Sequence, residues 1–164
     1  MQKIVYTTIG RIETPFTNAE GMPIQAKFSQ KEGYVIVPSK YRDGLKGIEG
    51  FSHLILIYHF HKSKEMNLQV KPFLSTKTLG IFTVRAPNRP NPIGISVVEL
   101  VNIEYNKKEI RIKVKGVDML DQTPLLDIKP YIDEFDSYQG TRNGWYNERE
   151  FEKNISDDRF VKKP

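Results

Sequence analysis

The chain has 164 residues, a formal net charge of +5 at neutral pH and no cysteine. This length suits one domain with a core that is stable without cross-links, and the lack of cysteine excludes disulfides, thiolate metal sites and cysteine nucleophiles. No segment approaches the roughly twenty apolar residues of a membrane-spanning helix, and the first residues lack the apolar core of a signal peptide. We therefore expect a soluble, cytoplasmic protein whose positive charge suits an anionic partner such as RNA.

The first half of the chain contains three segments with strand character. Residues 3–13 are rich in β-branched side chains, and residues 33–37 form a short apolar run. Residues 51–61 form a longer apolar run with little alternation, which fits a central strand or a buried helix. On a strand, the three histidines of this run would share one face, because side chains alternate with a period of two. They are His53, His59 and His61.

Residues 79–96 place two apolar, strand-like runs around a loop that is stiffened by proline. The prolines are Pro87, Pro90 and Pro92, and the polar side chains of the loop are Arg85, Asn88, Arg89 and Asn91. Each proline fixes its own φ and restricts the preceding residue, so the loop is preorganised. The two guanidinium groups suit a carboxylate or a phosphate, and Gly94 allows a close approach of the backbone. We interpret this loop as the rim of an active site.

The second half of the chain begins with a predicted hairpin. Residues 95–105 and 109–117 are joined by Asn106-Lys107-Lys108, and the second strand alternates apolar residues with Arg111, Lys113 and Lys115. Its basic face is either a surface for a partner or the protected face of an edge strand. Residues 117–131 combine aspartates with turns expected at Thr123-Pro124 and Lys129-Pro130, which favours a polar pocket wall or a simple turn at residues 121–123.

These features predict an all-β fold, with a small β-barrel core of mostly antiparallel strands and short helices. Residues 1–135 would form the barrel domain, and residues 136–164 a C-terminal extension that could act as a dimer or docking arm. The motifs of Rossmann, P-loop and zincin enzymes are absent from the sequence. Ser52 and Ser96 lack the context of a nucleophile elbow, which leaves hydrolysis a minor alternative.

Short motifs along residues 4–133 match one known family in order. The most specific are Gly50-Phe51-Ser52-His53-Leu54, Arg89-Pro90-Asn91-Pro92-Ile93-Gly94 and Asp127-Ile128-Lys129-Pro130-Tyr131. They are accompanied by Thr14-Pro15-Phe16, Pro23-Ile24-Gln25, Gly80-Ile81-Phe82 and Thr123-Pro124-Leu125-Leu126. In this combination the chain resembles the TsaA/TrmO family of tRNA adenine N6-methyltransferases, which includes VirR-like proteins.

The resemblance implies a β-barrel that binds S-adenosylmethionine, forms a homodimer and methylates N6 of threonylcarbamoyl-adenosine at position 37, in the anticodon loop of tRNA. The donor-binding residues that it implies are Pro23, Ile24, Gln25, His61, Lys62, Arg85, Ile95, Lys115, Gly116, Val117 and Asp118. The chain departs from the family at Gln122, where glycine is usual, and it lacks the extra C-terminal domain of longer members. These departures concern the local turn and the way in which the anticodon loop is held.

The implied chemistry needs positioning and removal of one proton. Because N6 of a carbamoylated adenine is a poor nucleophile, a general base would help, and Asp118, Asp127 and His53 are candidates by residue type. Arg85 could pair with the carboxylate of the donor. The candidates for contact with tRNA are Arg89, Asn91, Lys113, Lys129 and Tyr131. Two alternatives stay open: a non-catalytic module that binds an adenosyl ligand or RNA, and a metal-dependent β-barrel enzyme using His59 and His61.

Overall fold

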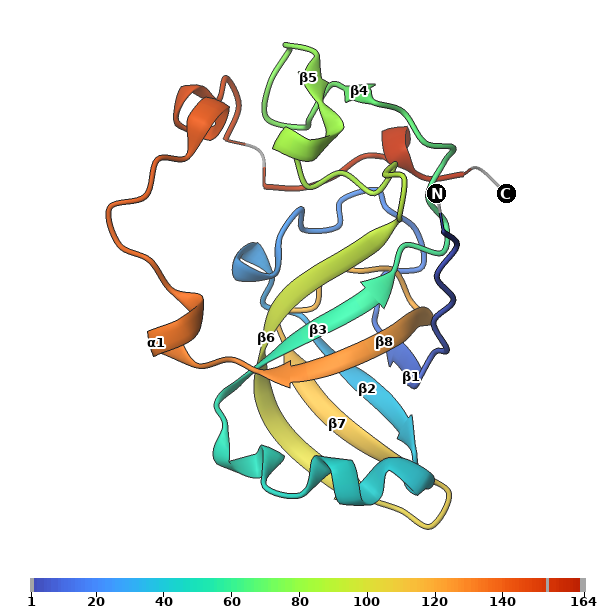
Figure 1. Ribbon diagram of the computed structural model, residues 1–164. Helices are drawn as coiled ribbons and strands as arrows, with labels where there is room; N and C mark the ends of the chain where they lie inside the picture. Colours follow the sequence, from blue (N-terminus) through green and yellow to red (C-terminus); the bar gives the residue numbers. More distant parts are fainter. Residues whose placement is uncertain (1, 153, 163–164) are drawn as a thin grey trace.

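Within the described residues, 2–152 and 154–162 of this computed structural model, six strands close into a barrel in the order β1-β2-β7-β6-β3-β8 (Figure 1). Every neighbouring pair of strands is antiparallel. The strands are β1 (Gly10–Glu13), β2 (Glu32–Pro38), β3 (His53–His59), β6 (Ile93–Tyr105), β7 (Glu109–Lys115) and β8 (Thr123–Pro130). The predicted all-β barrel is therefore confirmed.

The barrel interior follows from alternation along the strands. On β3, Leu54 and Leu56 are fully buried, and on β7 the same holds for Ile110, Ile112 and Val114. Successive side chains point to opposite faces, so these residues form one inward row on each strand. Burial of each such side chain contributes about 1.5–3 kcal/mol. The predicted β6–β7 hairpin is present, and the long apolar run of residues 51–61 is a strand and not a helix.

The strand β8 differs from the sequence prediction, which expected turns at Thr123-Pro124 and Lys129-Pro130. Residues 123–130 instead form a continuous strand that pairs with β1 on one side and β3 on the other. Pro124 and Pro130 are the second and last residues of this strand. Proline lacks an N–H group and cannot donate a hydrogen bond to a neighbouring strand. Near the end of a strand this missing donor disrupts the pairing least.

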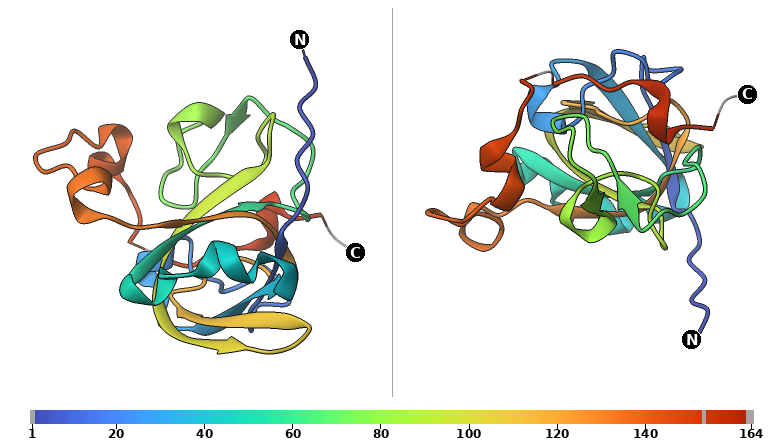
Figure 2. Two further views of the ribbon diagram at one scale, coloured as in Figure 1. Left: turned by 60° about the horizontal axis from the view of Figure 1, so that its bottom comes forward. Right: turned by 90° about the horizontal axis from the view of Figure 1, so that it is seen from above.

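The first strand is shorter than predicted. The expected strand covered residues 3–13, but β1 comprises Gly10–Glu13, and the exposed residues 2–8 extend away from the barrel (Figure 2). Ile9 donates its N–H to the carbonyl of Leu125, and Ile4, Val5 and Tyr6 are exposed. High β propensity yields a strand only where a partner strand is available, which explains the difference.

Loops and short helical turns cover both ends of the barrel in Figure 1. The remaining elements are β4 (Gln69–Val70), β5 (Leu79–Gly80), α1 (Asp133–Asp136) and the 3-10 helices η1 (Ala26–Phe28), η2 (Ser39–Leu45), η3 (Ile48–Gly50), η4 (Ile81–Thr83), η5 (Gly144–Glu148) and η6 (Asp158–Phe160). The predicted strand after Leu79 is thus reduced to two residues followed by η4. No helix in the described part of the chain is long and apolar enough to cross a membrane.

The C-terminal segment leaves the barrel at α1, runs beside it and returns across its upper end (Figures 1 and 2). Its return is fixed by contacts with the barrel loops. Phe160 is buried in a small apolar cluster with Ile81 and Val84, and the Ser156 hydroxyl donates to the carbonyls of Ala19 and Met22.

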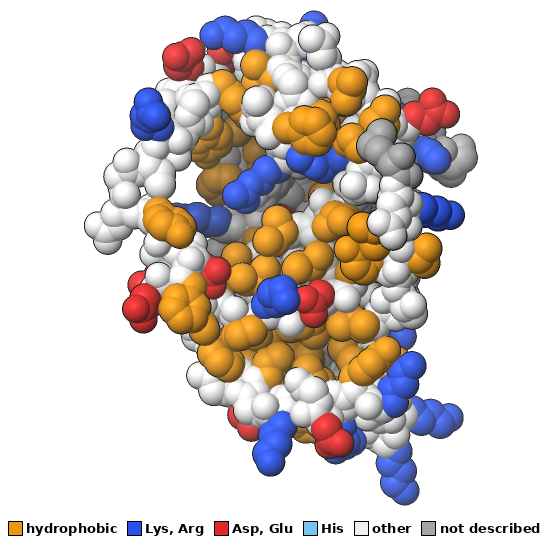
Figure 3. Space-filling model, viewed as in Figure 1, with side chains coloured by type: hydrophobic (Ala, Val, Ile, Leu, Met, Phe, Trp, Pro, Cys, Tyr) orange, Lys and Arg blue, Asp and Glu red, His pale blue; other side chains and the backbone are white. Residues whose placement is uncertain are grey.

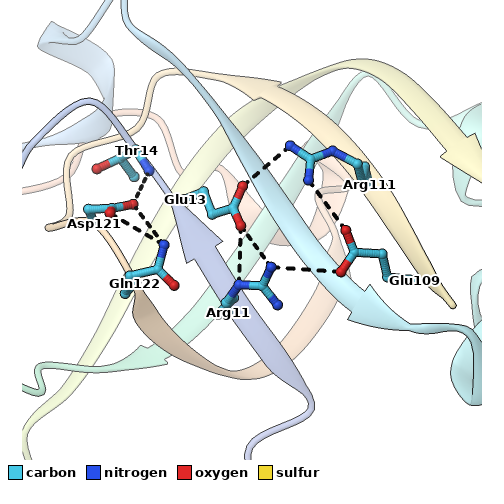
Figure 4. Close-up of polar contacts among 7 residues, drawn as sticks. All are labelled: Arg11, Glu13, Thr14, Glu109, Arg111, Asp121 and Gln122. Carbon is cyan, nitrogen blue, oxygen red and sulfur yellow. Dashed lines mark hydrogen bonds and ion pairs between the residues drawn. The ribbon is translucent and has the colours of Figure 1, made fainter.

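The basic face of β7 is largely paired with carboxylates. Glu13 accepts hydrogen bonds from Arg11 at 2.8 Å and from Arg111 at 3.3 Å, and Arg111 also contacts Glu109 (Figure 4). In addition, Lys113 forms an ion pair of 2.7 Å with Glu32. Because β7 has neighbours on both sides in the closed barrel, the edge-strand interpretation of this face is wrong. Water screens these exposed pairs, so they add little to stability, but they neutralise much of the predicted basic surface.

Candidate functional site

A cavity of about 360 Å³ opens at the upper end of the barrel, where β3 ends and β6 and β8 begin. Its wall combines stretches that are distant in sequence: Met22–Gln25, Tyr58, Phe60–Ser63, Val84–Pro87, Gly94–Ile95, Asp118–Leu120 and Ser156–Asp157. The proline-stiffened arginine loop and the aspartate-rich segment therefore meet at one cavity, in agreement with the donor-binding residues that the family resemblance implies.

Arg85 supplies the cationic side of the cavity. Its Nη1 donates a hydrogen bond of 2.8 Å to Oε1 of Gln25, whose own amide donates to the carbonyl of Ile24. This contact orients the guanidinium but engages one of its five N–H groups. The others remain suited to a carboxylate or phosphate, so Arg85 is a candidate for binding the anionic end of a ligand.

Three polar side chains form a hydrogen-bonded chain that ends on the acidic group of the cavity. The Ser96 hydroxyl donates to Oδ1 of Asp118 at 2.6 Å, and the Tyr58 hydroxyl lies 3.0 Å from Oγ of Ser96. Because the Ser96 proton is directed to Asp118, Tyr58 is the donor to Ser96. Tyr58 and Ser96 are 3% and 4% exposed, so this chain holds Asp118 from inside the barrel.

Burial raises the pKa of Asp118 to about 6, against the lowering effects of the Ser96 hydrogen bond, backbone N–H groups and Arg85. Part of the side chain faces the cavity, but its surroundings withdraw the carboxylate from bulk water. Burial, and then the charge of Asp118, raises the pKa of Tyr58 far above its usual range, so Tyr58 stays protonated. Asp118 is mostly ionised at neutral pH and has the proton affinity of a general base.

Sequence reasoning did not identify Tyr58 as a site residue, and it considered Ser96 only as a nucleophile. The signal lay in the strand register, where Leu56 is paired with Ser96 and Tyr58 with Gly94. Both polar residues occupy inward positions in otherwise apolar rows of β3 and β6. A buried polar group needs a hydrogen-bond partner, so two such residues at adjacent positions indicate a functional network.

His61 lines the cavity as a neutral imidazole. Burial makes the largest contribution to lowering its pKa, and the charges of Lys62 and His59 lower it further. The three histidines do not gather: His53 and His59 are at opposite ends of β3, about 20 Å apart along an extended strand. Among the described residues, no group of three His, Asp or Glu side chains is placed to hold a metal ion.

Two polar residues of the arginine loop maintain its shape. Nη1 of Arg89 donates to the carbonyls of Ile81 and Val84, at 3.1 and 2.8 Å. Asn88 is 5% exposed, and its amide donates to the carbonyl of Glu65. Arg89 therefore fixes the loop through backbone carbonyls, which limits its freedom to reach a tRNA phosphate.

Most of the predicted donor-binding residues line the cavity. They are Pro23, Ile24, Gln25, His61, Lys62, Arg85, Ile95 and Asp118. The other three, Lys115, Gly116 and Val117, lie outside its lining, and Val117 is fully buried in the barrel core. Gly116 adopts a φ of 95°, a left-handed turn two residues before Asp118. Met119 and Leu120 follow Asp118 into the cavity wall instead.

The remaining candidates lie away from the cavity lining. His53 is exposed at the start of β3 and makes an edge contact with Tyr131, with ring centroids 6.2 Å apart. Asp127 forms a 2.8 Å ion pair with Lys129 on β8. Asn91 is exposed on the arginine loop. Of the three predicted catalytic candidates, Asp118 is the one that the structure brings together with Arg85.

A comparison with known protein families identifies the family of this chain. A family model described as the tRNA-methyltransferase O N-terminal domain matches residues 11–137. The chain belongs to this family. The match covers all six barrel strands except the first residue of β1, and it includes both walls of the cavity that carry Arg85 and Asp118.

Individual relatives agree with the family match. A protein of Pyrococcus abyssi named "Probable S-adenosyl-L-methionine-binding protein" is 48% identical over 160 residues, which cover 96% of this chain and 85% of that protein. The tRNA (adenine(37)-N6)-methyltransferase of Escherichia coli is 34% identical over 139 residues, which cover 80% of this chain and 59% of that enzyme. The crystal structure of TrmO from Pseudomonas aeruginosa aligns with a TM-score of 0.71 and 33% identity, covering 87% of this chain and 62% of that one. This chain thus spans about three fifths of the length of each of these two methyltransferases.

Proposed function

We propose that this chain is an S-adenosylmethionine-dependent methyltransferase that acts on N6 of threonylcarbamoyl-adenosine at position 37 of tRNA. The observation that carries the proposal is the joint cavity, in which Arg85 and the partly withdrawn carboxylate of Asp118 line one space. The names of the relatives support it, because they describe S-adenosylmethionine binding and tRNA adenine-37 N6 methylation. The cytoplasm, where tRNA is modified, is the expected location.

The lining of the cavity fits the donor. Apolar side chains of Met22, Val84 and Ile95 surround its space, and such surfaces suit an adenine ring and a thioether chain. Arg85 would pair with the carboxylate of the methionine part, because a guanidinium matches a carboxylate in shape and charge. S-adenosylmethionine supplies an electrophilic methyl group when bound.

Asp118 provides the proton acceptor that methylation of N6 requires, and its neighbours hold it in place. With a pKa of about 6, Asp118 is ionised at neutral pH and can take the N6 proton. Ser96 donates to Oδ1 and Tyr58 donates to Ser96, which holds the carboxylate of Asp118 in place as the candidate proton acceptor. Both donors are buried and fixed, so the carboxylate is preorganised before substrates bind.

A homodimer fits the outer face of strands β3, β6 and β8, where hydrophobic side chains gather (Figure 3). On β6 the exposed residues are Ile93, Ile95, Val97 and Val101, which are 42%, 55%, 39% and 44% exposed. A contiguous apolar face of this kind commonly marks an interface, and a second copy placed by two-fold symmetry would cover it with the same face. Since Ile95 also lines the cavity, the dimer interface would adjoin the donor site.

Mass analysis of tRNA nucleosides tests the proposal. We expect purified protein, S-adenosylmethionine and tRNA that carries threonylcarbamoyl-adenosine to give a methyl mass gain on that nucleoside. The matched control is the same tRNA transcribed without the modification, which should gain no methyl group. Equal methylation of both tRNAs would contradict the proposed acceptor, and methylation of neither would contradict the activity.

A non-catalytic binding module is the second candidate, because several relatives are named for S-adenosylmethionine binding and this chain spans 59% of the E. coli enzyme. Calorimetry with S-adenosylhomocysteine separates the two functions. Binding of this compound together with turnover supports the methyltransferase, whereas binding without turnover on any tRNA supports the module.

A further inference from the structure

A second cavity, of about 540 Å³, adjoins the first and shares one wall with it. The residues that line both are Ile24, Gln25, Phe73, Val84, Arg85, Ala86, Pro87 and Phe160. Arg85 therefore faces both spaces from the loop that separates them. A molecule in the second cavity would lie directly beside a ligand in the first.

The far wall of the second cavity comes from the C-terminal segment. Asn143, Trp145 and Tyr146 line it, and Figure 3 shows the surface hollowed between this segment and the upper end of the barrel. Nε1 of Trp145 donates a hydrogen bond of 2.8 Å to the carbonyl of Thr83. This bond fixes the indole ring across the cavity from the barrel, although Trp145 lies outside the residues that the family model matches.

The lining of the second cavity is aromatic and positively charged. The aromatic residues are Phe28, Phe73, Trp145, Tyr146 and Phe160, and the charged residues are Lys27 and Arg85. Acidic side chains are missing from the described lining. Aromatic rings bind nucleobases by stacking, at about 1–3 kcal/mol per base, and cationic side chains bind the phosphates. This combination selects a nucleotide of RNA over a neutral apolar ligand.

We propose that the second cavity receives the acceptor purine of the RNA, extruded from the anticodon loop and held against Trp145. Lys27 then counters the negative charge that the nucleotide carries on its phosphate or its threonyl carboxylate, and Arg85 on the shared wall adds to the positive potential while it pairs with the donor. This proposal rests on the proposed function, since it assigns the first cavity to the methyl donor and the second to the acceptor. An extruded base must be unstacked and read in a pocket, and the shared wall brings that pocket next to the donor. In this arrangement the N6 edge of the purine faces the first cavity, because Asp118 lines the first cavity and not the second.

Trp145 provides a direct measurement, because it is the only tryptophan of the chain. With the first cavity saturated by S-adenosylhomocysteine, we expect an anticodon stem-loop RNA that carries threonylcarbamoyl-adenosine to quench the fluorescence of Trp145. Lys27→Ala should raise the dissociation constant of this RNA about ten-fold, while Lys40→Ala, a change in η2 outside the cavity lining, should leave it unchanged. Affinity for S-adenosylhomocysteine should be the same in all three proteins.

A second pair of variants addresses the stacking contact and possible unfolding. Trp145→Phe keeps an aromatic ring, whereas Trp145→Ala removes it, and we expect the alanine variant to raise the KM for tRNA at least five-fold over the phenylalanine variant. Circular dichroism checks that both are folded. If the alanine variant does not fold, Lys27→Ala and the quenching titration decide the question.

The outcomes separate this proposal from the proposed function. Methylation of tRNA with no quenching, and with an unchanged KM in Lys27→Ala, would overturn the acceptor cavity while leaving the methyltransferase intact. Quenching by RNA without any methylation would overturn the activity and keep the second cavity as a nucleotide site. Full quenching by S-adenosylhomocysteine alone would show that the donor occupies this space, and it would overturn the proposal.

Discussion

Gly94 lies against the ring of Tyr58, so closely that a Cβ on Gly94 would overlap the ring atoms Cδ2, Cε2 and Cζ. The two residues face each other in the register of β3 and β6. The glycine thereby makes room for the tyrosine whose hydroxyl donates to Ser96, one step from Asp118. The hydrogen bonds from Tyr58 to Ser96 and from Ser96 to Asp118 therefore require that residue 94 has no side chain.

Gly94→Ala should therefore damage both stability and activity. The added methyl group must displace Tyr58, and overpacking of this kind costs about 1–3 kcal/mol. We expect a lower free energy of unfolding in urea and a loss of methyl transfer greater than the loss of folded protein. Gly50→Ala is the control, because nothing lies within 4 Å of a Cβ at Gly50. Equal effects of the two substitutions would contradict the role assigned to Gly94.

Asp118→Asn should abolish most activity but stabilise the fold at neutral pH. The pKa of Asp118 is raised from 3.8 to about 6, so between these values the folded protein binds a proton that the unfolded chain has lost. Wild-type stability from this group is full below pH about 4 and declines by up to about 3 kcal/mol as the pH rises through 6. Asparagine does not titrate, so the stability gain of the variant should appear over this pH window.

Urea unfolding at several pH values measures this gain, and methyl transfer is expected to fall about 10²–10⁴-fold. In the wild-type protein the rate should rise through pH 6 as Asp118 ionises. A stability difference that does not change between pH 4 and 7 would contradict the raised pKa, and normal turnover by the variant would exclude Asp118 as the base.

The two arginines of the loop should behave differently. Arg89 holds the carbonyls of Ile81 and Val84, so Arg89→Ala should lower the free energy of unfolding by about 2 kcal/mol. Arg85 is exposed and contacts Gln25, so Arg85→Ala should change stability by less than about 0.5 kcal/mol. Calorimetry should show the opposite order for S-adenosylhomocysteine, with at least a ten-fold weaker affinity in Arg85→Ala. The reverse pattern would exchange the roles of the two residues.

Gln122 is the one described non-glycine residue with a positive φ, at 59°. A side chain in this left-handed region costs about 1–2 kcal/mol, which is why glycine is favoured in this backbone conformation. Gln122→Gly should raise the midpoint of urea unfolding, with a net gain of about 0.5–1 kcal/mol after the greater freedom of the unfolded chain is counted. Gln122→Ala keeps the strain and should give no gain, so stabilisation by alanine would argue against backbone strain.

The apolar face of β3, β6 and β8 predicts a dimer that one charge can disrupt. We expect sedimentation equilibrium to show a dimer for the wild-type protein and a monomer for Val97→Glu, because a lone carboxylate is costly to bury. Met66→Glu, which changes a more exposed apolar residue in the loop between β3 and β4, should remain dimeric. A monomeric wild-type protein would contradict the homodimer.

The sequence revealed those parts of the fold whose signal is local. Alternation of Ile110, Ile112 and Val114 with basic residues sufficed for the β6–β7 hairpin. The strand β8 was not predicted, because Pro124 and Pro130 indicate turns. Only the pairing with β1 and β3 shows that the two prolines lie near the ends of a strand.

The site was predictable to the same extent. The arginine loop and Asp118 were accessible from motifs and residue types. In contrast, the contact of Tyr58 with Ser96 depends on the register of two strands, and the wall supplied by Trp145 depends on how the C-terminal segment returns across the barrel. Contacts between residues that are distant in sequence leave no periodic pattern from which they could be predicted.

β1 is four residues long, yet it pairs with β2 on one side and β8 on the other. The contact of Gly10 with Leu125 joins residues more than a hundred positions apart, and such pairings slow folding to the range of milliseconds to seconds. Deletion of these few residues would leave two unpaired sheet edges, and open edges promote aggregation. The shortest strand of the barrel thus governs both how fast the molecule folds and whether it remains dispersed in solution.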